Sequence, residues 1–398
     1  MLVSETAAIL GVPIDNLNLE EAVQSIFSMV EAYEADKRPR QVITVNVDFV
    51  VNTLAWKPGR TSHSELLDVY RKADLATPDG MPLVILGRLL GVPMKERFTG
   101  SDLIPGLAAE AARRNKSFYL LGGRKGVGAL AARSLQKDHP GLIVAGVDDP
   151  RVRLDADGAR DGDRLIIERI NAAKPDILLI AFGNPKQELW FHRNRSRLRV
   201  PVSIGVGGSF EFFAGTIQRA PAEMRDAGLE WLFRILQEPH LFKRYLMDFI
   251  KLGLMLLPAM ICHCHTCLSL RCSGQDNGPR LNEAMGRSRS INLPDSALVV
   301  ELPAGFAGAL VKRVREELQQ KLSGSEHVIV DFSRVEHMDG GALGLIARAW
   351  RRAGEENKAL YATGASPRIL RLLRLNRMLD IFGDRWIPSY RGEGYTRS

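Results

Sequence analysis

The chain contains the stretch Asp176-Ile-Leu-Leu-Ile-Ala-Phe-Gly-Asn-Pro-Lys-Gln-Glu-Leu189, an apolar run that leads directly into a polar turn. The apolar part is typical of a buried parallel strand. The Gly-Asn-Pro turn then places Lys186, Gln187 and Glu188 at the carboxyl end of that strand, the edge of an open α/β sheet where ligands bind. The stretch therefore predicts a parallel sheet with a polar site at its edge. Simple solvation of a loop is the alternative that this segment leaves open.

Strand-like and helix-like segments alternate on both sides of this stretch, through residues 1–230. Helical runs such as 102–115 and 128–137 lie between the strand-like ones. The expected strands are Gln41–Val45, Asp74–Thr77, Ser117–Leu121, Leu142–Val147, Asp176–Phe182 and Pro201–Val206. This alternation predicts an α/β fold, a Rossmann-like, mostly parallel sheet with helices on both faces.

Composition bounds the class of protein. A chain of 398 residues predicts two or three domains, and 45% hydrophobic with 25% charged residues is ordinary for a globular protein. The net charge of +8 fits nucleic acid, an anionic membrane surface or phosphorylated substrates. Because neither zinc-finger spacing nor an aromatic RNA-binding signature is present, we expect no nucleic-acid partner. The first residues lack the features of a secretory signal, and all four cysteines fall between Cys262 and Cys272, so we expect a reducing cytoplasm.

The pattern changes after residue 230. Residues 231–272 are first basic and aromatic and then apolar, and 273–294 form a polar linker by composition. A second, small α/β domain is expected over 295–390, with strands at Ala297–Leu302 and Val328–Phe332 and helices at 341–353 and 367–380. A further helix is predicted by one apolar face, made of Ala307, Val311, Val314, Leu318 and Leu322.

Three polar residues follow the first two strands. Asp79 lies in Thr77-Pro-Asp-Gly80, where a carboxylate is well placed as a general base, although the same residues also form common turns. Thr44 and Asn46 end the first strand. They either bind a polar ligand or cap the following helix.

The turn Gly122-Gly-Arg-Lys-Gly-Val-Gly128 lies between a strand and a helix. Glycines at such a place let backbone amides approach a phosphate, and Asp148 and Asp149 follow at about the distance of the acidic residue in dinucleotide-binding folds. The spacing is nevertheless Gly-x-x-Gly-x-Gly rather than Gly-x-Gly-x-x-Gly. A nicotinamide-dependent enzyme is therefore one hypothesis, and a tight strand-to-helix turn is its alternative.

An ordered set of motifs runs from about residue 8 to residue 250. It comprises Thr44-Val-Asn46, Pro78-Asp-Gly80, Glu96-Arg-Phe-Thr-Gly-Ser-Asp102, Gly183-Asn-Pro-Lys-Gln-Glu188, Gly205-Val-Gly-Gly208, Arg219-Ala-Pro221, and Glu230-Trp231 through Arg244-Tyr245. In this order the set resembles the WecG/TagA/CpsF family of glycosyltransferases, glycosyltransferase family 26. The resemblance implies transfer of a sugar, with inversion, from a nucleotide-sugar donor to a lipid-diphosphate-linked acceptor at the cytoplasmic membrane face, without a metal or other cofactor.

The resemblance also implies roles for individual residues. Asp79 matches the family's base, which removes the acceptor hydroxyl's proton. Arg97 is the first candidate to stabilise the departing nucleoside diphosphate, and a solvated basic face is the alternative for the arginines nearer the C-terminus. The substrate-binding set is Thr44, Asn46, Arg97, Asn184, Lys186, Gln187, Glu188, Gly207, Gly208, Arg219, Arg234 and Arg244.

The sequence departs from the family pattern at two places. Asp148-Asp-Pro150 replaces a turn that is often aromatic and proline-rich, which leaves the donor open. His240 stands where the family is often more basic, which leaves fewer positive charges in the arm for the diphosphate. The expected donor is a UDP-sugar carrying N-acetylmannosamine, its uronic acid, or a hexose or hexuronic acid. The expected pathway builds a surface polysaccharide, such as an exopolysaccharide, or a cell-wall glycan.

Residues 231–272 predict a membrane-associating arm. Asp248 and Lys251 lie opposite an apolar helical face that follows Lys243 and Arg244, as in interfacial amphipathic helices. That face comprises Leu246, Phe249, Ile250, Gly253, Leu254 and Leu257. A core helix and a spanning helix remain the alternatives, since the uncharged stretch from Leu252 to Leu270 nearly reaches the length of a span. We therefore expect a protein peripherally associated with the inner face of the plasma membrane.

Cys262-His-Cys-His-Thr-Cys267, with Cys272, contains residue types that suit zinc. Ligands so close together lack the usual paired spacing, so free thiols at a helix end are the favoured interpretation, and no metal site is predicted.

The segment Val330-Asp-Phe-Ser-Arg-Val-Glu-His-Met-Asp-Gly-Gly-Ala-Leu-Gly344 resembles the STAS domain, named for sulfate transporters and anti-sigma-factor antagonists, over about residues 295–385. In the regulatory branch a serine at the start of this helix is phosphorylated, and a phosphate there alters partner binding. Here Gly340 and Gly341 occupy those positions. The sequence therefore predicts a constitutive protein-interaction module, with a passive stabilising domain as the alternative.

Besides the nicotinamide-dependent enzyme, the sequence leaves two hypotheses of different classes for the whole chain. One is the membrane-associated glycosyltransferase. The other is a binding protein that senses a nucleotide sugar and relays the signal to a partner through the STAS-like domain. A homo-oligomer is compatible with both.

Overall fold

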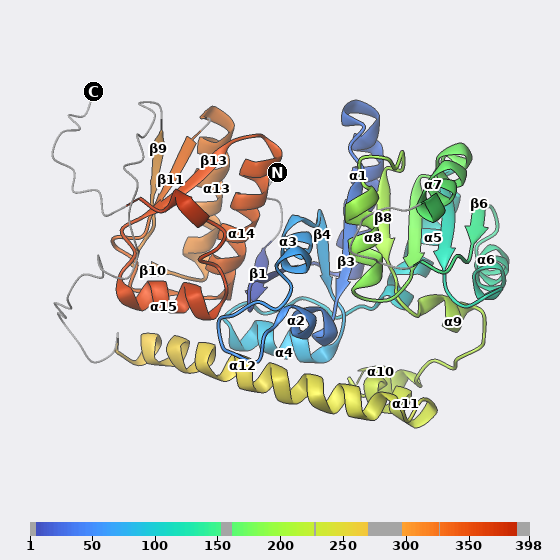
Figure 1. The fold of residues 1–398 in the computed structure, drawn as a ribbon, viewed down its shortest axis with the longest axis horizontal. Coiled ribbons are helices and arrows are strands. Elements are labelled where there is room, and N and C mark those ends of the chain that lie inside the picture. Colours follow the sequence, from blue (N-terminus) through green and yellow to red (C-terminus); the bar gives the residue numbers. More distant parts are fainter. Residues whose placement is uncertain (1–4, 153–160, 227, 270–296, 326, 388–398) are drawn as a thin grey trace.

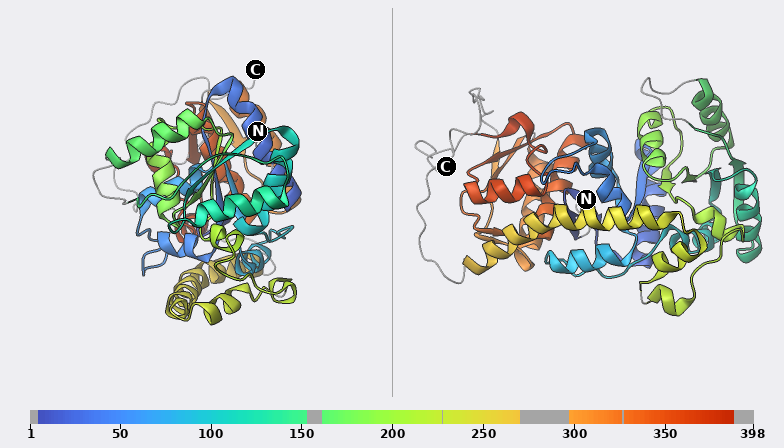
Figure 2. Two further views of the ribbon diagram at one scale, coloured as in Figure 1. Left: turned by 90° about the vertical axis from the view of Figure 1, so that its right-hand side faces the viewer. Right: turned by 60° about the horizontal axis from the view of Figure 1, so that its bottom comes forward.

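The computed structural model describes residues 5–152, 161–226, 228–269, 297–325 and 327–387. Two α/β units lie side by side and give the molecule an elongated outline (Figure 1). We call residues 5–269 the N-terminal unit and residues 297–387 the C-terminal unit. The long helix α12 (Leu241–Ser269) runs beneath both of them, as Figure 2 also shows.

The N-terminal unit is built on a six-stranded sheet in the order β4-β3-β8-β7-β5-β6, in which all neighbours are parallel. The strands are β3 (Arg40–Val45), β4 (Leu75–Pro78), β5 (Ser117–Gly122), β6 (Ile143–Asp148), β7 (Ile177–Ala181) and β8 (Val202–Gly205). The predicted fold class is confirmed, and each predicted strand is present to within one residue at either end. Continuous apolar runs made this possible, because both faces of a parallel sheet are buried.

Helices cover both faces of this sheet (Figure 2). Along β7, Ile177 and Leu179 belong to one core while Leu178 and Ile180 belong to another on the opposite face. The helices are α1 (Leu19–Asp36), α2 (Val47–Thr53), α3 (Ser64–Lys72), α4 (Met81–Leu89), α5 (Gly100–Arg114), α6 (Val127–Asp138), α7 (Asp161–Ala173), α8 (Lys186–Asn194) and α9 (Ser209–Phe213). The alternation of buried residues along each strand thus fixes a three-layer arrangement.

A short hairpin precedes the sheet and is absent from the sequence-based prediction. Its antiparallel strands are β1 (Thr6–Ile9) and β2 (Val12–Asp15), joined by Leu10 and Gly11, both with positive φ. All eight strand residues are buried. The hairpin lies between the main sheet and the C-terminal unit (Figure 1).

The C-terminal unit holds a three-stranded parallel sheet in the order β13-β11-β9. Its elements are β9 (Leu298–Glu301), β10 (Gly305–Phe306), α13 (Ala309–Gly324), β11 (His327–Asp331), β12 (His337–Met338), α14 (Gly340–Glu355), β13 (Ala359–Thr363), α15 (Pro367–Leu375) and η1 (Gly383–Arg385). Four of the five residues of the predicted apolar face are buried on α13, namely Val311, Val314, Leu318 and Leu322, whereas Ala307 lies before the helix and is only partly buried. In addition, α15 ends at Leu375 rather than near Asp380, and β10, β12, β13 and η1 were not predicted.

Three helices at the end of the N-terminal unit form the arm: α10 (Ala222–Asp226), α11 (Glu230–Gln237) and α12. Leu252, Met255, Leu256 and Ala259 of α12 are buried against the body of the protein. The predicted apolar face is on the other side and is exposed. The predicted linker 273–294 lies outside the described residues, and the boundaries 1–230, 231–272, 273–294 and 295–390 stay predictions.

Candidate functional site

Polar side chains from distant parts of the sequence gather at the carboxyl edge of the six-stranded sheet. They line a cavity of about 320 Å³ between the ends of β3, β4, β7 and β8 and the arm. The predicted residues on its wall are Thr44, Asn46, Asp79, Arg97, Asn184, Gln187, Gly207, Gly208, Arg234 and Arg244. Sequence motifs up to 200 residues apart therefore share one cavity.

Asp79 follows β4 directly, and its backbone amide still donates to the carbonyl of Val45 on the neighbouring strand at 2.7 Å. This bond extends the pairing of β3 and β4 by one residue and fixes the position of the Asp79 backbone, from which the carboxyl group projects. Gly80 has φ +117°, a conformation that L side chains rarely adopt, so glycine is needed for the turn into α4. Burial and the nearby carboxylate of Glu230 raise the pKa of Asp79 to about 8, while Arg97 acts in the opposite direction.

Arg97 lines the cavity together with this carboxyl group and Glu230. Its guanidinium group pairs with Glu230 at 3.1 Å. Arg219, also predicted for the site, instead donates to Asp102 at the start of α5 and lies 3.6 Å from Glu230. Arg219 is not on the cavity wall, so of these two arginines Arg97 is the one in position to contact a ligand.

Gln187 joins the two loops that follow β7 and β8. Its Oε1 accepts from the amides of Gly183 at 3.2 Å and Gly207 at 3.1 Å. A Cβ at Gly205 would lie 2.5 Å from the Gln187 Nε2, so only glycine leaves room for this side chain. The amide thereby sets the spacing of the two loops across the floor of the cavity.

Glu188 and Lys186 do not line the cavity. Glu188 is buried beneath it and accepts from Gln187 Nε2 at 2.7 Å and Asn184 Nδ2 at 3.0 Å. Burial raises the pKa of Glu188 to about 7. Lys186 is exposed at the first position of α8. The predicted trio thus divides into a loop-joining amide, a buried carboxyl group and a solvent-exposed ammonium group.

Thr44 and Asn46 both line the cavity, and of the two only Asn46 caps a helix. Thr44 donates to the carbonyl of Gly205 at 3.1 Å and remains on the cavity wall. Asn46 caps α2 by accepting from the amide of Phe49 at 3.3 Å, and it also faces the cavity. Capping and ligand contact are therefore compatible at Asn46.

The arm closes the cavity from below. Arg234 of α11 lies 3.4 Å from Glu238, and Arg244 of α12 lies 3.6 Å from Asp48. The arm also contributes residues to which the sequence gave no individual role: Glu230, Trp231, Tyr245 and Phe249. All but Phe249 belong to the quoted motifs. The motifs therefore pointed to these positions, although the sequence offered no reason to assign each of them to the site.

Comparison with known proteins identifies the family of the chain. The sequence model of the glycosyl transferase WecG/TagA/CpsF family matches residues 7–263. This chain belongs to the WecG/TagA/CpsF glycosyl transferase family. A STAS domain model, described as Mlab, matches residues 290–382 in the C-terminal unit of this glycosyltransferase.

Relatives of this glycosyltransferase share one name, N-acetylglucosaminyldiphosphoundecaprenol N-acetyl-beta-D-mannosaminyltransferase. The protein from Bacillus spizizenii is 33% identical over 178 residues, which are 45% of this chain and 66% of the relative. The protein from Bacillus subtilis is 30% identical over 61% of this chain and 88% of its own length. That from Staphylococcus aureus is 28% identical over 57% and 83%. The chain thus spans just under two thirds of the first relative and most of the other two.

The glycine-rich turn of this glycosyltransferase contributes no residue to the wall of the cavity. The amide of Gly126, at the start of α6, donates to Asp149 Oδ2 at 2.7 Å. A carboxylate of the chain itself thus holds the amide that a phosphate would need. The arrangement matches the alternative of a tight strand-to-helix turn.

Metal ligation was weighed at Cys262-His-Cys-His-Thr-Cys267. Among the described residues of this glycosyltransferase, no three His, Cys, Asp or Glu side chains gather in a way that could hold a metal ion. The side chain of Cys262 is partly buried. The remaining side chains of the run lie outside the described part of the chain, and the predicted thiols there stay predictions.

Proposed function

We propose that this glycosyltransferase transfers N-acetylmannosamine, with inversion, from UDP-N-acetylmannosamine to N-acetylglucosaminyl diphosphate carried on a polyprenol. The observation that carries the proposal is the cavity that joins Asp79, Gln187 and three guanidinium groups. The names of the relatives favour this sugar and this acceptor over the uronic acid and hexose donors. The product would enter cell-wall glycan or surface polysaccharide synthesis.

Asp79 supplies the base for this reaction. An acceptor hydroxyl attacks the anomeric carbon while its proton passes to the carboxylate, and the bond from that carbon to the diphosphate oxygen breaks on the opposite face. A carboxyl group with pKa near 8 accepts a proton more readily than an ordinary aspartate once it is ionised. The nearby Arg97 then balances the charge of the ionised form.

Arg97, Arg234 and Arg244 supply positive charge for the departing diphosphate. They reach the cavity from the segment before α5, from α11 and from α12. Gly208 borders the same space without a side chain, so a phosphate oxygen can approach its backbone, whereas the Gly207 amide already donates to Gln187. Preorganised donors of this kind stabilise charge that develops during the reaction.

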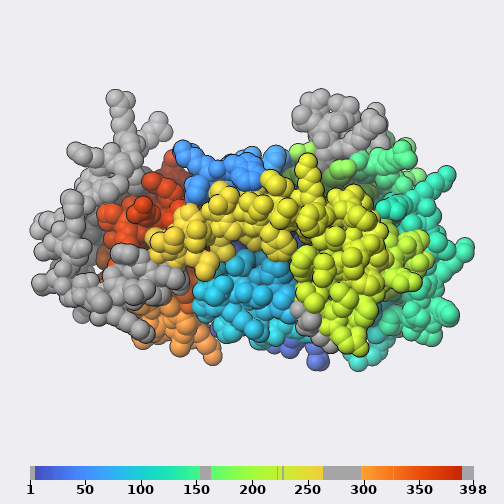
Figure 3. Space-filling model, turned by 90° about the horizontal axis from the view of Figure 1, so that it is seen from below, coloured from blue at the N-terminus to red at the C-terminus, as the bar shows by residue number. Residues whose placement is uncertain are grey.

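In this proposal the arm brings the site to a membrane surface. Figure 3, a view from below, shows α12 crossing this face of the molecule. Exposed apolar side chains of α11 and α12 comprise Leu232, Leu236, Phe242, Leu246, Met247, Phe249, Ile250, Leu254, Leu257 and Ile261. Phe249 also lines the cavity, so the membrane-facing surface continues into the site. A lipid-linked acceptor would reach Asp79 along this route.

The arm lies on the membrane surface in this proposal, at the cytoplasmic face. Residues Leu241–Cys262 are long and apolar enough to cross a membrane by length and composition. However, Leu252, Met255 and Leu256 pack on the body of the protein, and a spanning helix would have to leave that contact. An amphipathic helix buried on one side therefore fits an interfacial position better.

The test measures UDP release by the full chain with UDP-N-acetylmannosamine and a polyprenyl-diphosphate-linked N-acetylglucosamine. Asp79→Asn should bind UDP as the unchanged protein does and lose most turnover, and Asp138→Asn, an exposed carboxylate on α6, should keep it. Full turnover by Asp79→Asn would reject the base assignment. Tight binding of nucleotide sugars without UDP release from any of the expected donors would favour the sensing protein instead.

A further inference from the structure

One face of the C-terminal unit is covered by the N-terminal unit. At the start of α14, the Gly340 amide donates to the carbonyl of Leu90 at 2.7 Å. One turn further, a Cβ at Gly344 would overlap with the carbonyl oxygen of Thr6 on β1. The two glycines at 340 and 341, which replace the phosphorylatable position, are both buried here. We call this surface, formed by α14 and the end of α15, the docked face.

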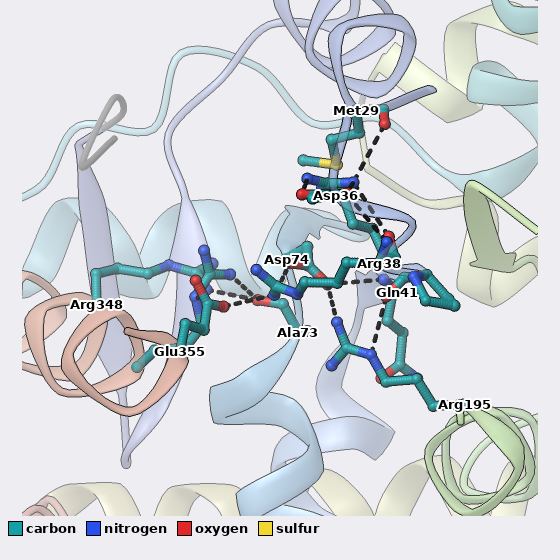
Figure 4. Close-up of polar contacts among 12 residues, drawn as sticks. Met29, Asp36, Arg38, Gln41, Ala73, Asp74, Arg195, Arg348 and Glu355 are labelled. Atoms are coloured by element: carbon teal, nitrogen blue, oxygen red, sulfur yellow. Dashed lines mark hydrogen bonds and ion pairs between the residues drawn. The ribbon is translucent and has the colours of Figure 1, made fainter. Parts of the chain in front are cut away.

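Charged side chains inside this contact are paired across it. Arg348 of α14 donates to both carboxylate oxygens of Asp15 on β2 and to the carbonyl of Ala73 at 2.8 Å. Arg38 joins Asp74 at 2.6 Å to Glu355 at 2.7 Å, as Figure 4 shows. Buried charges that lose a partner cost several kcal/mol. Separating the two units at the docked face would therefore cost several kcal/mol, which favours a permanent contact.

Two further arginines connect the end of α15 to α2 and α3. Arg377 donates to the carbonyl of Thr53 at 3.0 Å and to its hydroxyl at 2.7 Å. Arg71, fully buried at the end of α3, pairs with Asp380 at 2.9 Å. The C-terminal unit thus holds the last residue of α2 and the penultimate residue of α3.

The neighbours of those two residues hold a side chain of the cavity. Asn52, next to Thr53, donates to the Asn184 Oδ1 at 2.7 Å. Tyr70, next to Arg71, accepts from the Asn184 Nδ2 at 2.6 Å. Asn52 and Tyr70 thus orient Asn184 from outside its own loop. Each of them is next in sequence to a residue, Thr53 or Arg71, that contacts the C-terminal unit.

We propose that the partner of the STAS-like unit is this chain's own glycosyltransferase unit, and that docking positions Asn184 in the cavity through Thr53–Asn52 and Arg71–Tyr70. The inference rests on the proposed function for its kinetic readout. The helices α2 and α3 contain only seven and nine residues, too few to be stable alone, so tertiary contacts at their ends decide where they lie. Asp380 and Arg377 supply such contacts, and they are positioning residues.

A double-mutant cycle tests this connection in the full chain. Asp380→Asn removes the carboxylate that pairs with Arg71, and Tyr70→Phe removes the hydroxyl that binds Asn184. Each single variant should lower kcat/KM about fivefold, and the double variant should lose little more, since both act through one connection. Asp384→Asn, an exposed carboxylate in η1, is the matched control and should leave kcat/KM unchanged. Multiplied losses in the double variant would overturn the proposal.

Thr53→Val tests the second connection without a change in side-chain volume. It should lower kcat/KM by a similar factor. Amide hydrogen exchange in residues 183–188 should become faster in Asp380→Asn and in Thr53→Val, and not in Asp384→Asn. This measurement needs no substrate, so it tests the positioning of Asn184 independently of the proposed transferase function. Unchanged exchange in both variants would overturn the positioning role, whereas faster exchange in a protein without transferase activity would overturn only the proposed function.

Discussion

At the scale of single residues, Glu230 and Arg97 act in opposite directions on the Asp79 carboxyl group. The base must be ionised to accept a proton, so activity should rise with pH as Asp79 titrates near pH 8. Glu230→Gln removes a negative charge that disfavours ionisation, which lowers the pKa. The acid limb of kcat/KM against pH should then move to lower pH by about one unit.

Glu238→Gln serves as the control for this prediction. Glu238 belongs to the same arm and also pairs with an arginine, Arg234, at 3.4 Å, but it is not among the groups that shift Asp79. Its profile should match that of the unchanged protein. An acid limb that stays in place in Glu230→Gln would show that another group controls the profile.

Gly205 allows a second prediction at this scale. A Cβ there would lie 2.5 Å from the Gln187 Nε2 and 2.8 Å from the Glu188 Oε1, and both side chains are buried. Gly205→Ala should therefore destabilise the protein by about 1–3 kcal/mol and reduce turnover, because the loops joined by Gln187 must move apart. Thermal unfolding and UDP release measure the two effects.

Gly253 on α12 provides the comparison, because a Cβ there meets nothing within 4 Å. Gly253→Ala should be neutral or slightly stabilising in a helix. Equal unfolding temperatures for Gly205→Ala and the unchanged protein would mean that the floor of the cavity can absorb a methyl group.

At the scale of elements, the sequence predicts the strands well and the contacts between distant elements poorly. Each parallel strand carries its own signal, a continuous apolar run bounded by polar residues. The hairpin β1–β2 carries little sequence signal, because its strands have only four residues each. Their burial also depends on α14, which lies more than 300 residues later in the chain. Local patterns cannot report a covering element that lies so far along the chain.

The candidate site also has a part that the sequence predicts and a part that it does not. Asp79, Thr44 and Asn46 could be predicted to share one edge of the sheet because each lies at or just after the end of a predicted strand, and the carboxyl ends of parallel strands meet at that edge. Lys186 belongs to the same turn as Gln187, yet α8 begins there and leaves it outside the cavity wall. Which residues of a turn face a cavity depends on the exact start of the next helix, which sequence patterns place only to within a few residues.

The arm gives a prediction at the scale of the element. Leu254 and Leu257 lie on one face of α12 and are 52% and 55% exposed. Replacing both with lysine should weaken binding to vesicles, because burying one such side chain contributes about 1.5–3 kcal/mol. We expect binding about tenfold weaker or more in vesicle co-sedimentation, and a parallel loss of turnover on lipid-linked acceptor.

Leu130→Lys is the matched control, since Leu130 is 46% exposed on α6, away from the arm. It should bind vesicles as the unchanged protein does. If the double lysine variant still binds normally, the exposed face of α12 does not contact the membrane.

At the scale of the whole molecule, the docked face makes the two units one cooperative body. Ala8 of β1 is part of the C-terminal unit's hydrophobic core, and Arg348 pairs with Asp15 in a buried contact. A unit that shares core residues with its neighbour cannot unfold without exposing them. Full-length protein should therefore unfold in a single calorimetric transition.

Arg348→Ala should separate that transition into two. The substitution leaves Asp15 buried without its guanidinium partner, which costs about 3–5 kcal/mol. Because this pair joins the two units, the loss weakens the contact between them. Arg334→Ala removes an exposed surface pair with Glu301 at 3.8 Å and should shift the unfolding temperature little, since such pairs contribute about 0–1 kcal/mol. Differential scanning calorimetry distinguishes the outcomes. One unshifted transition in Arg348→Ala would show that the contact between the units carries little free energy, and two transitions in the unchanged protein would show that docking does not couple them.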